Sequence, residues 1–89
     1  MISTRITISN KLGVHARASA KLTKLAGSYP CEIFISRGSR RVNAKSIMGV
    51  MMLAAGMGTE IELETAGERE QEAMDALLAL VGDKFGEGE

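Results

Sequence analysis

The segment Glu60-Ile61-Glu62-Leu63-Glu64 constrains the fold most, because charged and aliphatic residues alternate strictly along it. This alternation is typical of a β-strand that has one face in water and the other against a core. Residues 2–9 alternate in a similar way, with isoleucine at positions 2, 6 and 8. We therefore expect a sheet with one polar and one apolar face, and the apolar face needs a cover.

Two segments with helical spacing can supply that cover. After His15, apolar residues recur every three or four positions up to a helix stop at Gly27. From Glu68 onward a second apolar stripe appears, and acidic residues lie in its first turn, where the helix dipole favours them. The two stripes consist of Ala18, Leu22, Leu25 and Ala26, and of Ala73, Met74, Leu77, Leu78 and Val81.

The middle of the chain predicts a hairpin followed by a short helix. Residues 31–36 and 40–43 have strand character and flank a turn at 37–39. Ser46 precedes the apolar run 47–53 and is the natural N-cap of a helix there. The resulting order, β-α-β-β-α-β-α, predicts an α+β fold in which helices cover one face of an antiparallel sheet. We expect one domain over residues 1–89.

Composition excludes two classes of protein. The single cysteine, Cys31, cannot form an intrachain disulfide or a multi-thiolate zinc site, and it suits a reducing cytoplasm. Residues 1–5 lack the apolar stretch of a signal peptide. The longest apolar run, 47–57, contains two glycines and is too short to cross a bilayer. We therefore expect a cytoplasmic protein without membrane insertion, not a secreted scaffold.

The net charge of zero hides an asymmetry between the two halves of the chain. Residues 1–45 hold nine Lys and Arg and one acid, for +8, whereas residues 46–89 hold two Lys and Arg and ten acids, for −8. The basic half suggests an anionic ligand such as phosphate. Nucleic acid is not expected, because no aromatic stacking residues lie among the cations. The alternative is that the two halves simply neutralise each other in the fold.

His15 is the only histidine, and it lies where a glycine-containing loop enters the first predicted helix. A lone histidine is more often a packing or surface residue, but this position changes its chemistry. The amides of Ala16 and Arg17 are helix-start donors without helical partners, and with the dipole they favour an anion. Arg17 adds a guanidinium that can hold two phosphate oxygens. The combination suits reversible phosphoryl transfer through the imidazole.

At this point the sequence resembles a known family. Gly13-Val14-His15-Ala16-Arg17, followed by an alanine-rich basic helix, resembles the active-site signature of HPr, the histidine-containing phosphocarrier family of the bacterial phosphoenolpyruvate-dependent sugar phosphotransferase system. The segment from Lys45 to Met51 resembles the second signature of the family, around a regulatory serine. The resemblance spans nearly the whole chain and implies an open-faced β-sandwich with four antiparallel strands in the order 1-4-2-3.

The resemblance also implies roles for individual residues. His15 matches the histidine that enzyme I phosphorylates on Nδ1, and Arg17 matches the arginine that contacts the phosphoryl group. Ser46 matches the serine that HPr kinase/phosphorylase modifies. An apolar patch that docks enzyme I and enzyme IIA is matched by Ala20, Ile47, Met48 and Met51. Such a protein is a monomeric carrier rather than an enzyme, and it needs no cofactor or metal.

Some features have plainer interpretations, which stay open here. Ser46 acts as an N-cap whether or not a kinase modifies it. The methionines at 48, 51, 52 and 57 suit either a core or an adaptable binding surface. Ala18 replaces the proline of many family members, and this change leaves the helix intact. Two alternative functions also remain: a carrier in a nitrogen-related regulatory phosphotransfer chain, and a non-catalytic α+β regulatory domain.

Overall fold

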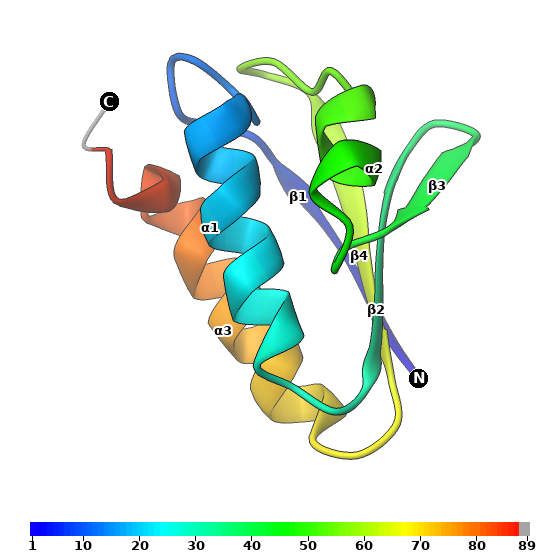
Figure 1. Cartoon of the computed structure of the whole chain (residues 1–89). Coiled ribbons are helices and arrows are strands. Elements are labelled where there is room, and N and C mark those ends of the chain that lie inside the picture. Colours follow the sequence, from blue (N-terminus) through cyan, green and yellow to red (C-terminus); the bar gives the residue numbers. More distant parts are fainter. Residues whose placement is uncertain (88–89) are drawn as a thin grey trace.

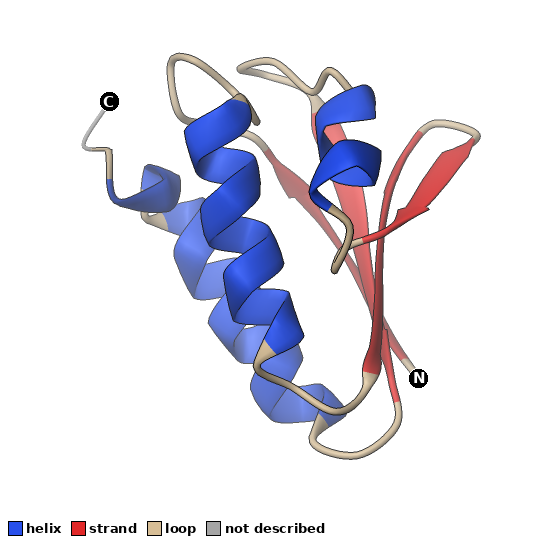
Figure 2. Ribbon diagram, in the orientation of Figure 1, coloured by secondary structure: helices blue, strands red, loops and turns tan. Residues whose placement is uncertain are grey.

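A computed structural model describes residues 1–87 and shows one sheet with helices on one side (Figures 1 and 2). None of the helices in this part of the chain is both long enough and apolar enough to cross a membrane. The elements are β1 (Ile2–Thr7), α1 (Ala16–Gly27), β2 (Glu32–Arg37), β3 (Arg40–Asn43), α2 (Ile47–Met52), β4 (Glu60–Ala66), α3 (Glu70–Gly82) and the 3₁₀ turn η1 (Lys84–Gly86).

The sheet is antiparallel, and its strand order is β1-β4-β2-β3, as the resemblance implied. The alternating segment lies in β4, which pairs with both β1 and β2. Its residues Ile61, Leu63 and Thr65 are buried, whereas the glutamates between them face the other side. The central position of β4 explains why its alternation is the clearest in the chain: one of its faces is entirely covered and the other is open.

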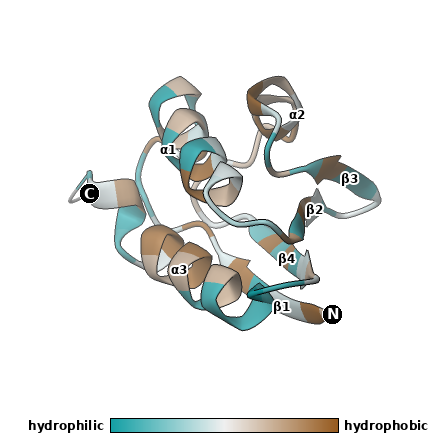
Figure 3. Cartoon of the chain, turned by 60° about the horizontal axis from the view of Figure 1, so that its bottom comes forward, coloured by the Kyte–Doolittle hydropathy of each residue, from teal (hydrophilic) through white to brown (hydrophobic). Residues whose placement is uncertain are grey.

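The helices cover the apolar face of the sheet and complete one core (Figures 1 and 3). Both predicted stripes turn toward this core, although Leu25 and Leu78 are only partly buried. Cys31 is a small buried residue of this core. The largest fully buried side chains are Phe85, Ile8, Leu22, Ile33, Ile35, Leu53, Ile61, Leu63, Met74, Leu77, Val50 and Val81.

The structure corrects several of the expected bounds. The turn of the hairpin is only Gly38-Ser39, because Arg37 pairs with Arg40 and extends β2 by one residue. Strand β4 continues to Ala66 because Glu32 of β2 still pairs there.

A core role for the four methionines is wrong, since Met48, Met51, Met52 and Met57 are all exposed.

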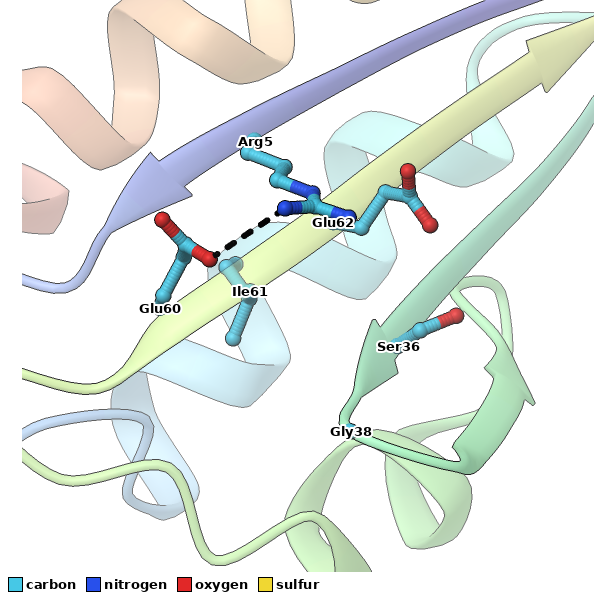
Figure 4. Close-up of a pocket in the computed structure, with 6 residues that line it drawn as sticks. All are labelled: Arg5, Ser36, Gly38, Glu60, Ile61 and Glu62. Atoms are coloured by element: carbon cyan, nitrogen blue, oxygen red, sulfur yellow. Dashed lines mark ion pairs between the residues drawn. The ribbon is translucent and has the colours of Figure 1, made fainter.

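The open face of the sheet is polar, and Figure 4 shows a shallow hollow on it. Arg5 and Glu60 form an ion pair at 3.9 Å across β1 and β4. Arg41 binds Glu64 with two nitrogens at 3.1 and 3.3 Å, and its guanidinium also lies 3.7 Å above the Phe34 ring. The hydroxyl of Ser3 donates to Glu62 at 2.8 Å. Each glutamate of β4 on this face therefore has a cationic or hydroxyl partner on another strand, which explains how the face stays in water without a cover.

Candidate functional site

The loop between β1 and α1 is held in one conformation by contacts that place His15. Gly13 has a φ of +68°, and a Cβ at this position would lie 2.5 Å from the carbonyl oxygen of Ala55. The next amide, that of Val14, donates to the same oxygen at 2.9 Å. Only glycine allows the loop to approach residues 55–56 so closely. The glycine of the first signature therefore fixes the loop against the segment that follows α2.

His15 is the N-cap of α1 and has extended backbone angles. Its ring nitrogen Nδ1 accepts a hydrogen bond from the backbone amide of Arg17 at 3.2 Å. The ring thus turns Nδ1 toward the start of the helix, where the first amides and the positive end of the dipole lie. The side chain of His15 is 29% exposed, so a partner can reach it. An anionic group attached to Nδ1 would lie against these amides.

A pocket beside the ring is lined with cationic side chains. It brings Lys11, Arg17 and Lys21 together with His15. Arg17 makes no side-chain hydrogen bond or ion pair with any residue between 1 and 87, so its guanidinium is available to a phosphoryl group. Lys21 is different, because its Nζ donates to the carbonyl oxygen of Phe85 at 2.6 Å. The sequence alone did not decide between an exposed helix surface and a partner contact for Lys21, and the structure places this side chain in the pocket.

The C-terminal segment folds back to the site, which the sequence did not predict. Phe85 is buried in the core. Lys84, Phe85 and Gly86 all have positive φ angles, of 54°, 56° and 76°. For the two non-glycine residues this conformation costs about 1–2 kcal/mol each. Burial of the aromatic ring offsets that cost, and the chain is turned back toward the start of α1 (Figure 1).

The side chain of Glu87 contacts the imidazole of His15. Its Oε2 lies 2.5 Å from Nε2 of His15, and its Oε1 accepts from the side-chain amide of Asn10 at 3.0 Å. Partial burial disfavours the charged carboxylate, but the hydrogen bonds from Asn10 and His15 and the nearby charge of Lys21 outweigh it, so the pKa of Glu87 lies below its usual range. The carboxylate is therefore ionised at neutral pH.

The predicted partner surface and regulatory serine lie on α1 and α2, which pack side by side (Figure 1). Ala20, Ile47, Met48 and Met51 are all exposed, as a docking patch requires. Ser46 is the predicted N-cap of α2, and its Oγ accepts from the amide of Gly49 at 3.2 Å. Met52, which lies outside the second signature, is also exposed on α2.

Within residues 1–87, no group of three or more His, Cys, Asp or Glu side chains comes together as metal ligands would. His15 and Glu87 are the two side chains of these types that meet at the pocket. Asn10 contacts Glu87, and Lys21 also lines the pocket. The arrangement therefore places an imidazole nitrogen, Nδ1, against the first amides of α1 and beside cationic side chains.

Comparisons with known proteins agree with this geometry. A family described as "PTS HPr component phosphorylation site" matches residues 2–83. The phosphocarrier protein HPr of Cupriavidus necator is 64% identical over 89 residues, and the match covers 100% of both chains. The phosphocarrier protein NPr of Shewanella violacea is 44% identical and covers 97% of this chain and 94% of its own. The crystal structure of HPr-C-His from Thermoanaerobacter tengcongensis superimposes with a TM-score of 0.94 at 40% identity, covering 98% of each chain. The chain therefore belongs to the HPr family of phosphocarrier proteins.

Proposed function

We propose that the chain accepts a phosphoryl group from phospho-enzyme I on Nδ1 of His15 and passes it to enzyme IIA components of the sugar phosphotransferase system. The observation that carries this proposal is the orientation of the ring, whose Nδ1 lies 3.2 Å from the amide of Arg17 at the start of α1. As a phosphocarrier, the protein holds the group covalently and is not itself an enzyme. Membership of the family supports the assignment.

The site favours a phosphorylated ring on electrostatic grounds. A phosphoryl group on Nδ1 would bring negative charge to the N-terminus of a twelve-residue helix, where unpaired amides and the dipole stabilise anions. Lys11, Arg17 and Lys21 line the same pocket and add positive charge. The open pocket leaves the group accessible for onward transfer, as a carrier requires.

The direct test is incubation of the purified protein with enzyme I and labelled phosphoenolpyruvate. The label should be stable in base and labile in acid, because a phosphoramidate hydrolyses once its nitrogen is protonated. A label that survives acid would indicate a phosphoester on a hydroxyl group and would contradict the proposal.

Arg17→Ala should slow phosphorylation of His15 by about ten- to a hundredfold, because a bidentate guanidinium contact contributes about 1.5–3 kcal/mol. Lys24→Ala is the matched control, since Lys24 is an exposed cation on the same helix outside the pocket. Lys21 is unsuitable for this purpose because it also holds Phe85. The initial rate of labelling by enzyme I is the measurement. Equal losses in both variants would show that general positive charge, not a specific contact, matters.

The exposed residues Ala20, Ile47, Met48 and Met51 are the proposed docking patch for both partners. Methionine side chains are flexible and polarisable, so one surface can fit two different proteins. Exposed hydrophobic residues clustered on a helix of six residues need an explanation other than packing, and partner binding supplies one.

Phosphorylation of Ser46 by an HPr kinase/phosphorylase is the proposed regulation. The modification adds about −1.5 to −2 charge at neutral pH. It would lie beside Ile47 and Met48 at the edge of the docking patch, where a charged group must be desolvated when enzyme I binds.

Ser46→Asp should therefore reduce the rate of His15 labelling by enzyme I several-fold, while Ser46→Ala should transfer normally. Ser46→Ala should instead lower the free energy of unfolding by about 1 kcal/mol, because the hydrogen bond to Gly49 is lost. Labelling rates and urea unfolding of the three proteins separate the two effects. If Ser46→Asp transfers at the rate of the unmodified protein, the serine is a structural cap alone.

A carrier in a nitrogen-related regulatory chain is the second candidate, and the relative named NPr favours it. The two candidates are distinguished by comparing the labelling rate with enzyme I of a sugar phosphotransferase system and the rate with enzyme I of a nitrogen-related phosphotransfer system.

We also propose that the protein is cytoplasmic and monomeric. Light scattering coupled to size-exclusion chromatography should give the mass of one chain, and twice that mass would contradict the monomer.

A further inference from the structure

We propose that Glu87 is a positioning residue for His15: its carboxylate holds the hydrogen of the ring on Nε2 and leaves the lone pair on Nδ1. This inference rests on the proposed function, since it names the group that prepares His15 for phosphoryl transfer. The residue lies 72 positions from the histidine and outside both signatures.

The two contacts of the imidazole favour the same tautomer, and the short contact with the charged carboxylate of Glu87 favours it more strongly than the longer contact with the Arg17 amide. An ionised carboxylate can only accept hydrogen bonds, so Nε2 must donate to Oε2 of Glu87 across 2.5 Å. A backbone amide can only donate, so Nδ1 must accept from Arg17 across 3.2 Å. A neutral imidazole carries one hydrogen, and both contacts favour its position on Nε2, with the carboxylate of Glu87 as the stronger of the two. The nucleophilic lone pair then points toward the anion-binding start of α1.

The carboxylate is itself held from both sides. Asn10 is fully buried and donates to Oε1 of Glu87 at 3.0 Å and to the carbonyl of Gly13 at 2.7 Å. It therefore ties the loop that carries His15 to the C-terminal segment. Phe85 anchors that segment in the core, and Lys21 binds its carbonyl oxygen. The side chain of Glu87 is only 12% exposed. Such support is what an orienting group needs, because a loose carboxylate would select no tautomer.

The same contact stabilises the ring during transfer. The lone pair of Nδ1 forms the bond to phosphorus, and the bond between phosphorus and the donor breaks with its electron pair remaining on the donor. No proton moves in this step, so the ring keeps its hydrogen on Nε2 and becomes positively charged. The carboxylate of Glu87 faces that charge directly, as the carboxylate of a Ser-His-Asp triad faces its imidazolium. Transfer to the next protein reverses the sequence.

Nitrogen-15 NMR of the His15 ring tests the positioning without any phosphoryl transfer. At a pH where the ring is neutral, the unmodified protein should show the tautomer with hydrogen on Nε2. Glu87→Gln keeps the size of the side chain but can donate as well as accept, so a mixture of tautomers should appear. Glu60→Gln is the matched control, because Glu60 lies on the open face of the sheet. An unchanged tautomer in Glu87→Gln would overturn the inference.

The rate of His15 labelling by enzyme I tests the role in transfer. Glu87→Gln should react about tenfold more slowly, and Glu60→Gln should react at the normal rate; removal of the hydrogen-bonded partner of a functional histidine commonly costs at least this much. An equal or faster rate in Glu87→Gln would overturn the inference but would leave the carrier function standing. A faster rate would show that the carboxylate competes with the phosphoryl group.

If the unmodified protein takes no label, the proposed function fails, and the role of Glu87 in transfer fails with it. The tautomer measured by NMR then decides whether Glu87 positions the ring.

Discussion

His15→Ala should take up no phosphoryl group from enzyme I, the largest functional effect expected of any single substitution in this chain. The variant lacks the nucleophile, and the pocket beside it contains no second histidine or cysteine. The fold should survive, because His15 is only partly buried and contributes one cap hydrogen bond to α1. We expect the free energy of unfolding to fall by about 1 kcal/mol.

The measurement pairs labelling with circular dichroism and urea unfolding on the same preparation. Absence of label in a folded variant assigns the phosphoryl group to His15. Full labelling of folded His15→Ala would end the carrier mechanism proposed here, because the group would have to reside on another side chain.

Phe85→Ala should cause the largest loss of stability, about 3–5 kcal/mol in the free energy of unfolding. Phe85 is a fully buried aromatic residue at a core edge, and its replacement leaves a cavity beneath α1 and α3. Alanine keeps the strained positive φ, so no backbone strain is relieved. A chain of this length has a total stability of about 4–13 kcal/mol, so the loss is a large share of it.

Urea unfolding followed by circular dichroism measures this loss, with Met52→Ala as the control. Met52 is a large apolar residue too, but it is 61% exposed, so its truncation should change the free energy of unfolding by less than about 0.5 kcal/mol. Equal stabilities for the two variants would mean that the C-terminal segment does not anchor in the core as described.

The sequence predicted the layered architecture because the buried and exposed faces of its strands and helices follow from the local spacing of apolar residues. The alternation in 60–64 and the two helical stripes depend only on which side chains meet the core. The helix-start site was also predictable, since an N-cap position and the first amides of α1 are local features. Resemblance to the family added the strand order, which periodicity alone cannot provide.

The contacts that complete the site could not be predicted, because they join distant segments. The approach of Gly13 to Ala55 and the contact of Glu87 with His15 link residues separated by 42 and 72 positions. The C-terminal segment also lacks any periodic pattern. One signal was present: Phe85 is a single large aromatic residue among glycines and charges, and such a residue near a terminus indicates an anchor.

The most direct test of the central claim is phosphorus-31 and nitrogen-15 NMR of the protein after phosphorylation by enzyme I. We expect a phosphorus–nitrogen bond at Nδ1 of His15, hydrogen retained on Nε2, and a large shift of the Arg17 amide as its hydrogen bond moves from Nδ1 to a phosphoryl oxygen. A phosphoryl group on Nε2, where Glu87 now lies, or on any residue other than His15, would contradict this expectation.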